Sequence, residues 1–206
     1  MKLAVFDFDS TLMDGETIEF LAREVGIEPE VKSITDRAMR GELDFFESLT
    51  QRVGLLKGLS VERVDTICRG LPLMEGAREV VSGLRERGYK VACFSGGFKN
   101  ATVPICRGLG IDVEFSNILH SVDGFLTGLV GGEMMFSDSK GQILQRLQSL
   151  LGVGVEDTLV VGDGANDLSM FRYAGTRVSF CGKPILEESA SVVIRTKDLR
   201  EVLSSC

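Results

Sequence analysis

Residues 5–11 read Val5-Phe6-Asp7-Phe8-Asp9-Ser10-Thr11 and place two aspartates where an apolar run meets a turn. The run from Leu3 to Phe6 is typical of a strand covered on both faces. Side chains alternate along an extended strand, so Asp7 and Asp9 leave it on the same side. Two carboxylates this close need a cation or a shared proton. The end of this strand is therefore either a reactive site or a solvated acidic strand end.

Length and composition indicate a small enzyme-sized protein. The 206 residues, 44% of them hydrophobic, fit one large domain or one domain with an insertion. A net charge of −7 argues against nucleic acid as the main partner. No apolar run is long enough to span a bilayer, and the first strand leaves no room for a secretory signal. We therefore expect neither a nucleic-acid nor a membrane partner.

The cysteine and histidine content limits the kinds of catalytic and metal site that we expect. The five cysteines form no C-x-x-C pair, which favours free thiols in a reducing, cytoplasmic compartment over disulfides or a zinc site. The only histidine, His120, flanks an expected hairpin and is interpreted as structural. Histidine triads and multi-histidine metal sites are therefore not expected.

Strand-like and helix-like patterns alternate along the chain. Helical periodicity separates the later strands, which predicts a parallel sheet with helices on both faces. The strand-like runs are Leu3–Phe6, Lys90–Phe94, Thr158–Val161, Arg177–Phe180 and Val192–Ile194. Two segments break the alternation. Residues 14–72 carry only helical patterns, and Asp123-Gly124 predicts a hairpin between short strands within residues 118–135. The fold class is therefore α/β, with an inserted helical lobe and a small hairpin.

The candidate chemical groups follow the expected core strands, where open α/β sheets bind ligands. Ser95-Gly96-Gly97 offers N–H groups and a hydroxyl to an anion, or is a plain tight turn. Lys140 is either a mobile ammonium for the site or a solvated surface residue. Asp163, Asn166 and Asp167 offer oxygen ligands suited to Mg²⁺, or form an ordinary Asp-Gly loop with a helix cap.

Taken together, these motifs resemble one family. The segments 7–11, 95–97, Lys140 and 162–167 match, in order and spacing, the four motifs of the haloacid dehalogenase-like phosphatases. Within them the chain is most similar to the phosphoserine phosphatases over nearly its whole length, including Phe180-Cys181-Gly182-Lys183-Pro184. The resemblance implies a Rossmann-like core, residues 1–13 and 75–206, and a helical cap domain, residues 14–74.

The resemblance also implies a mechanism. Asp7 attacks the phosphorus of a phosphate monoester, and water hydrolyses the aspartyl-phosphate. A free carboxyl group has a pKa of ~3.9, so Asp7 is expected to be ionised without help. Mg²⁺ is expected on Asp7, the backbone carbonyl of Asp9 and Asp163, with Asp167 in support. Asp9 acts as general acid and then as general base. The remaining phosphoryl contacts implied are Ser95, Gly96, Lys140 and Asn166.

Substrate selection is assigned by resemblance to the helical lobe. Glu16 is expected to bind the ammonium of phosphoserine and Arg52 its carboxylate, with Met39 and Phe45 as walls. Arg52 shares a helix face with Phe45 and Leu49, so it pairs with an internal acid, buries only its stem, or faces a ligand. A planar guanidinium suits a carboxylate. The lobe is expected to gate the site, hinged at Gly15 and at residues 73–76.

The implied activity is Mg²⁺-dependent hydrolysis of O-phospho-L-serine, the last step of serine biosynthesis, by a cytoplasmic monomer or homodimer. The alternatives are transfer of the phosphoryl group to another alcohol, hydrolysis of a different small monoester, and a non-catalytic phospho-ligand sensor or receiver. A nucleotide-binding dehydrogenase is excluded because no G-x-G-x-x-G opens a helix after the first strand.

Overall fold

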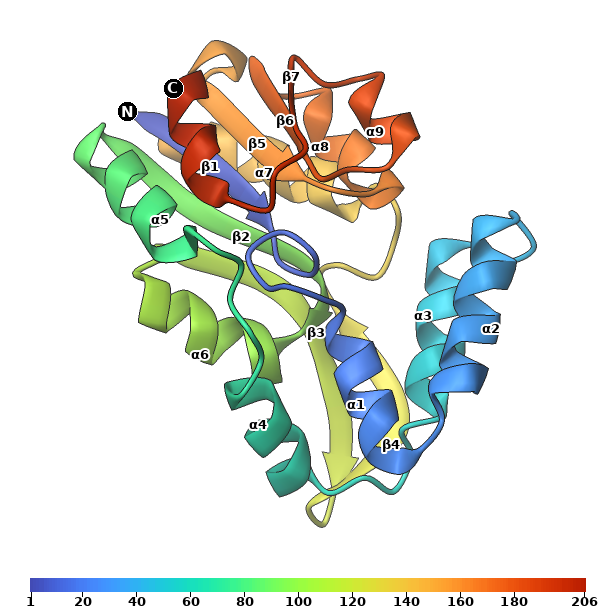
Figure 1. The fold of residues 1–206 in the computed structure, drawn as a ribbon. Helices are drawn as coiled ribbons and strands as arrows, with labels where there is room; N and C mark the ends of the chain where they lie inside the picture. The colour runs from blue at the N-terminus through green and yellow to red at the C-terminus, as the bar shows by residue number, and fades with distance from the viewer.

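A seven-stranded sheet forms the centre of the computed structural model, which describes all of residues 1–206 (Figure 1). The strand order is β4-β3-β2-β1-β5-β6-β7. Every neighbouring pair is parallel except the antiparallel pair β3–β4 at one edge. The strands are β1 Lys2–Asp7, β2 Tyr89–Phe98, β3 Val113–Val122, β4 Phe125–Gly132, β5 Thr158–Gly162, β6 Thr176–Phe180 and β7 Val192–Ile194. The predicted α/β class with a mainly parallel sheet is confirmed.

Both faces of the sheet are covered, as the apolar first strand predicted. Leu3 and Val5 pack into one hydrophobic cluster with α7 and α8, whereas Ala4 and Phe6 pack into another with α5 and α6. The nine helices are α1 Thr17–Val25, α2 Glu28–Met39, α3 Phe45–Gly54, α4 Val61–Arg69, α5 Ala77–Glu86, α6 Lys99–Leu109, α7 Ser139–Leu151, α8 Leu168–Phe171 and α9 Pro184–Glu187. No helix is both long enough and apolar enough to cross a membrane.

Helices α1 to α4 interrupt the chain between β1 and the helix α5 that leads into β2. Their apolar faces share one cluster with Leu119 and Leu126 of the β3–β4 hairpin, so the hairpin supports this helical region. Asp44 begins α3 with a reciprocal capping box, in which it accepts from the Glu47 amide at 2.7 Å. Figure 1 shows α2 and α3 side by side, projecting away from the sheet.

The two chain connections into and out of the helical region lie against each other. Met13 pairs with Leu73 in an isolated antiparallel bridge. The Asp14 amide donates to the Pro72 carbonyl at 3.0 Å, and the Met74 amide donates to the Leu12 carbonyl at 2.9 Å. The chain therefore enters and leaves the helical region through one narrow, paired junction.

Three local features differ from the sequence prediction. β2 does not stop at Phe94 but continues through the two glycines to Phe98, with irregular pairing to β3. The sequence pattern predicts no bounds for helix α6, which contains Pro104, a residue that disfavours a helix interior. The hairpin belongs to the main sheet, since β3 starts at Val113 and pairs with β2 in parallel. The strand pattern was too weak to predict the end of β2, which contains two glycines, and the start of β3, which mixes polar and apolar residues.

Candidate active site

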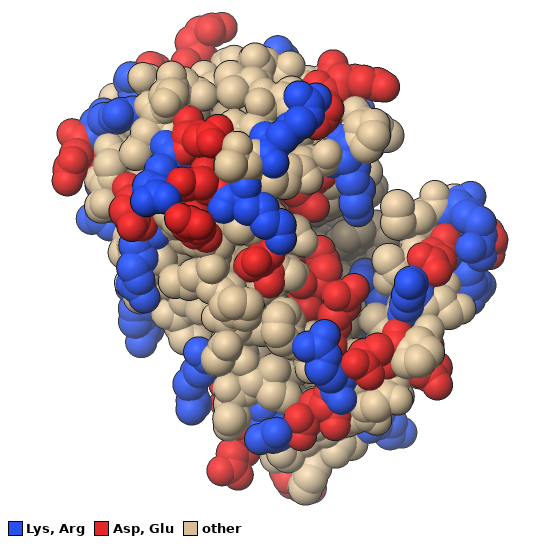
Figure 2. Space-filling view, viewed as in Figure 1, with Lys and Arg blue, Asp and Glu red and all other residues tan.

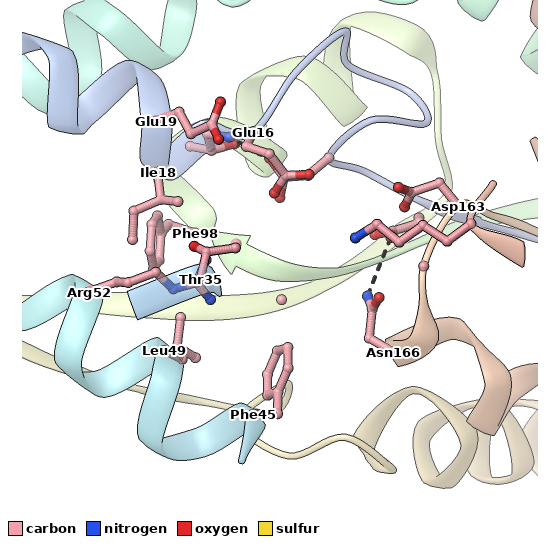
Figure 3. A pocket seen from close by; sticks show the side chains of 17 residues that line it. Glu16, Ile18, Glu19, Thr35, Phe45, Leu49, Arg52, Phe98, Asp163 and Asn166 are labelled. Carbon is pink, nitrogen blue, oxygen red and sulfur yellow. Dashed lines mark hydrogen bonds between the residues drawn. The ribbon is translucent and has the colours of Figure 1, made fainter. Parts of the chain in front are cut away.

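A cavity of about 290 Å³ opens at the carboxyl ends of β1, β2 and β5. Figure 2 shows the hollow between the α2–α3 pair and the rest of the molecule, with acidic side chains along its wall. Figure 3 shows Asp163 and Asn166 facing Phe45, Leu49 and Arg52 of α3. The cavity is lined by Asp7, Asp9, Glu16, Thr17, Ile18, Glu19, Thr35, Phe45, Leu49, Arg52, Gly96, Gly97, Phe98, Asp163, Gly164, Asn166 and Lys183.

Asp7, the last residue of β1, forms part of a buried ion-pair network. The Lys140 ammonium lies 2.7 Å from the Asp7 Oδ1 and 2.6 Å from the Asp167 Oδ1. Burial lowers the pKa of Lys140, but Asp167 and Asp7 outweigh that effect and raise it, so the lysine stays protonated. The Asn166 amide lies 3.5 Å from the Asp7 Oδ2 (Figure 3). This arrangement leaves one carboxylate oxygen of Asp7 at the floor of the cavity.

Burial sets the protonation of Asp7. Burial raises its pKa well above the usual range and Asp167 adds to that, whereas Lys140 acts in the opposite direction. The pKa of a free carboxyl group, on which the expectation for Asp7 was based, therefore does not apply in this environment. A nucleophilic carboxylate here depends on the positive charge that the site supplies.

Asp9 is held by three donors. The Thr17 amide and hydroxyl donate to its Oδ1 at 2.7 and 2.6 Å, and the Ser95 hydroxyl donates to its Oδ2 at 3.3 Å. Burial nevertheless raises the pKa of Asp9. The pKa of Asp9 is thus elevated, as expected of a proton donor. The cause is burial, and Asp7 is not among the main causes. Both aspartates face one cavity, as the alternation of the strand predicted.

Close backbone approach at β2 explains why glycines follow Ser95. A Cβ on Gly97 would lie 2.8 Å from the Asp9 Oδ2, and one on Gly96 would lie 2.9 Å from the Phe45 ring. Asn117 of β3 holds this stretch, since its side-chain amide donates to the carbonyls of Gly96 and Met134 at 3.0 and 3.1 Å. The strand end therefore presents its backbone to the cavity without a side chain in the way.

The carboxylates of Asp7, Asp163 and Asp167 fit a divalent cation. One oxygen from each lies within 4.8 Å of the others. Burial, reinforced by Asp167, raises the pKa of Asp163 to about 6. The Asp167 Oδ2 accepts from the amides of Asp163 and Gly164, both at 3.0 Å. Converging hard oxygen ligands with uncompensated negative charge are the donor set that Mg²⁺ or a similar ion takes in proteins.

Glu16 and Arg52 line the same cavity. Burial, together with Asp9 and Asp163, raises the pKa of Glu16 to about 8, although the Ser10 hydroxyl donates to it at 2.9 Å. Burial also lowers the pKa of Arg52, opposed by Glu16. The Arg52 Nε donates to the Ser48 carbonyl at 3.2 Å, and the side chain forms no salt bridge. Of the three interpretations of Arg52, a guanidinium facing the cavity matches this geometry.

The structure brings nearly all the predicted site residues together. Ser95, Lys140 and Asp167 lie buried beneath the cavity, where Ser95 contacts Asp9, Lys140 contacts Asp7 and Asp167 contacts Lys140. With one exception, the other predicted residues line the cavity. Met39 is the exception. It is 67% exposed and does not line the cavity, because the C-terminal end of α2 projects beyond the sheet. The prediction of Met39 as a wall is not supported by this arrangement.

The residue-level analysis missed three polar residues at the site. Thr17 orients Asp9, Asn117 holds the β2 end, and Lys183 lines the cavity. Thr17 directly follows Glu16, and Lys183 lies in the 180–184 segment, so both were near recognised features. Asn117 carried no local signal, because its role arises only from strand pairing.

Comparisons with known proteins agree with this geometry. The sequence model of the haloacid dehalogenase-like hydrolases matches residues 1–175. The chain is 60% identical over 204 residues to a Wolinella succinogenes protein named phosphoserine phosphatase, covering 99% of both. A solved phospho-aspartyl intermediate analogue of phosphoserine phosphatase superposes with a TM-score of 0.94 at 50% identity, covering 99% of this chain and 98% of that one.

A substrate-bound phosphoserine phosphatase structure is similar to the same degree. Its TM-score is 0.94 at 49% identity, and the match covers 99% of this chain and 97% of the other. The similarity thus includes the helical region as well as the sheet. With the four motifs converging on one cavity, this chain belongs to the haloacid dehalogenase-like hydrolases.

Proposed function

We propose that this protein hydrolyses O-phospho-L-serine to L-serine and phosphate through an aspartyl-phosphate on Asp7. The observation that carries the proposal is the single cavity that brings Asp7 and Asp9 together with Glu16 and Arg52. The phosphate group of phosphoserine is proposed to bind beside Asp7. Its carboxylate would pair with the Arg52 guanidinium, and its ammonium would favour the ionised form of Glu16, whose pKa burial raises to about 8. Full-length relatives named phosphoserine phosphatase support the assignment.

The reaction takes place in two steps at the end of β1. An oxygen of Asp7 bonds to phosphorus as the phosphorus–oxygen bond to serine breaks, and Asp9 protonates the leaving alkoxide. Water then attacks the aspartyl-phosphate, and Asp9 takes its proton. The raised pKa of Asp9 suits a group that carries the proton between the two steps.

Lys140, Ser95 and the Gly96 amide are proposed to bind the phosphoryl oxygens. Lys140 already neutralises Asp7 at 2.7 Å, so it also supports ionisation of the nucleophile. The Ser95 hydroxyl lies beside Asp9 and the Gly97 amide, at the end of β2. Donors fixed before the reaction stabilise the charge of the transition state without reorganisation.

We propose Mg²⁺ as the cation, held by Asp7, the Asp9 carbonyl and Asp163, with Asp167 positioning them. When bound, the ion offsets the repulsion between Asp7 and the phosphate dianion. Asp167 suits its supporting role because it accepts two backbone amides and contacts Lys140. Asp163 forms no salt bridge, so its carboxylate oxygens remain available to the ion.

We propose that residues 14–74 act as a cap domain that selects the substrate and covers the cavity, while residues 1–13 and 75–206 form the catalytic core. The paired junction at Met13 and Leu73 is narrow enough to act as a hinge. The Phe45 ring lies close to Gly96, where an added Cβ would meet it at 2.9 Å, and Phe46 stacks on Phe136 with ring centroids 5.5 Å apart. These contacts hold the end of α3 near the core.

The activity is tested directly with O-phospho-L-serine. Phosphate release is expected with Mg²⁺ and is expected to stop on addition of chelator, because the repulsion between Asp7 and the phosphate dianion is then no longer offset. Asp7→Asn should retain the fold yet lose turnover by at least ~10⁴-fold, since no acyl-phosphate can form. Phosphate release by the folded, metal-loaded Asp7→Asn protein would contradict the mechanism. Product analysis with added alcohols separates hydrolysis from phosphoryl transfer.

Asp9→Asn separates the two proton transfers. With phosphoserine, kcat is expected to fall by ~10³-fold, because the poor leaving group and the attacking water both need Asp9. With p-nitrophenyl phosphate, whose leaving group needs no proton, a burst of nitrophenol should remain ahead of slow steady-state turnover. The measurement is rapid-mixing absorbance. Near-normal turnover of phosphoserine would rule out the role of Asp9, and Asp36→Asn on the exposed side of α2 serves as control.

Arg52→Ala tests substrate selection. The KM for phosphoserine is expected to rise ~30- to 100-fold, because a charge-assisted bidentate contact is lost. Turnover of p-nitrophenyl phosphate, which has no carboxylate, should change less than ~3-fold. Arg69→Ala on exposed α4 is the matched control. Equal losses on both substrates would show that Arg52 serves structure instead of recognition.

Glu16→Gln tests the buried carboxyl group through pH and stability. The folded protein holds a proton on Glu16 up to a pKa of about 8, whereas the unfolded chain releases it near ~4.3. Stability therefore falls as pH rises through this window, and the loss is complete above pH 8. In chelator, Glu16→Gln should exceed wild type in Tm by at least ~3 °C at pH 9 and match it at pH 4.

The same substitution should abolish phosphoserine turnover, because the amide no longer pairs with the substrate ammonium. Glu19→Gln, which changes an exposed carboxylate at the same cavity, is the control. A Tm difference that does not vary with pH would contradict the assignment of the titration to Glu16.

A further inference from the structure

The loop after β6, Cys181 to Pro184, reaches the cavity but has no part in the chemistry described so far. Cys181 adopts a left-handed backbone with φ of 47°, and its amide donates to the Ile194 carbonyl at 2.7 Å. The Lys183 amide donates to the Asp163 carbonyl at 2.8 Å. Pro184 then begins α9. The loop backbone is therefore tied to both β7 and the Asp163 loop, which fixes where Lys183 leaves the chain.

The Lys183 side chain lines the cavity beside Asp163, Gly164 and Asn166 and forms no ion pair. Lys140 differs in this respect, because it is buried between two carboxylates. The field of Lys183 still reaches Asp163, whose pKa it lowers against the stronger effect of burial. Lys183 is thus an unpaired ammonium at the rim of the cavity, on the side where the phosphate group would bind.

The distribution of charge around the cavity indicates a role for Lys183. Five carboxylates line it, namely Asp7, Asp9, Glu16, Glu19 and Asp163, against two cations, Arg52 and Lys183. Arg52 lies on the α3 side, as Figure 3 shows, and Lys183 on the Asp163 side. A phosphate dianion approaching this cavity meets an excess of negative charge. A fixed cation at the rim raises the local concentration of such an anion and its rate of association.

We propose that Lys183 is a substrate-binding residue that pairs with the phosphoryl group of the incoming monoester and of the phosphate product. The proposal deepens, and rests on, the phosphatase function proposed above. Lys183 recognises the dianion that all monoesters share, whereas Arg52 recognises the part specific to phosphoserine. Lys183 and Arg52 thereby bind different parts of the substrate.

Three variants test the proposal. Lys183→Met removes the charge and keeps the length, Lys183→Arg restores the charge, and Lys57→Met removes an exposed lysine away from the cavity. Kinetics on phosphoserine and on p-nitrophenyl phosphate give kcat and KM for each protein. Inorganic phosphate serves as inhibitor, and the concentration of Mg²⁺ for half-maximal activity is measured in parallel.

In Lys183→Met, the KM for both substrates and the inhibition constant for phosphate are expected to rise ~10-fold, with kcat within ~3-fold. Its kcat/KM should also depend less on salt than that of the wild type. Lys183→Arg should recover to within ~3-fold, and Lys57→Met should match wild type. Equal effects on the two substrates set Lys183 apart from Arg52.

Two results would overturn the proposal. Unchanged phosphate inhibition in Lys183→Met would mean that the ammonium is merely solvated. A higher requirement for Mg²⁺ with unchanged KM at saturating metal would mean that Lys183 acts only through Asp163. If the wild type hydrolyses aryl phosphates but not phosphoserine, the proposed substrate fails while the phosphate measurements still decide the role of Lys183. Calorimetric binding of phosphate with Mg²⁺ gives the same comparison if no monoester is hydrolysed.

Discussion

The ammonium of Lys140, shared between Asp7 and Asp167, is the interaction on which the site depends. These three charges are almost completely buried, and their contacts are 2.6 to 2.7 Å long. Burying either carboxylate alone would cost several kcal/mol, so the lysine makes the cluster possible. It also fixes one oxygen of Asp7 and leaves the other at the cavity floor. The ion-pair network therefore both stabilises the metal-free site and orients the proposed nucleophile.

Excess negative charge is the second constraint. Burial raises the pKa of Asp7, Asp9, Glu16 and Asp163 alike, and neighbouring carboxylates add to the shift for Asp7, Glu16 and Asp163. Such a site is incomplete by itself and is stabilised by binding positive charge. The cations proposed here differ in where they act: a divalent ion and Lys140 beside Asp7, Arg52 across the cavity, and Lys183 at its rim. In the proposed function a divalent ion would offset the excess charge that folding leaves, and the anionic substrate adds to the need for these cations.

The sheet topology explains how distant segments meet. β1 lies between β2 and β5, so the residues after these three strands converge at one edge. The helical region is inserted directly after Asp9, which places Glu16 and Thr17 next to the catalytic loop by chain connectivity alone. Arg52 reaches the cavity only because α3 packs across from the sheet, where the β3–β4 hairpin supports the helix. The residues proposed for substrate selection and those proposed for the chemistry thus come from different parts of one continuous core.

The sequence by itself determined the alternation of strands and helices and the insertion after β1, because these follow from local periodicity. It also determined the grouping of the residues that follow parallel strands, because the carboxyl ends of those strands meet at one edge of the sheet. These residues are Asp7, Asp9, Ser95, Asp163 and Asp167. Their roles and those of Glu16 and Arg52 came from family resemblance, and the residues reach one cavity as expected. Only the tertiary structure decided that burial raises the pKa of Asp7, that Met39 lies outside the cavity and that Thr17, Asn117 and Lys183 lie at the site. Burial, strand pairing and the field of neighbouring charges depend on contacts between residues far apart in the chain, and no local pattern encodes them.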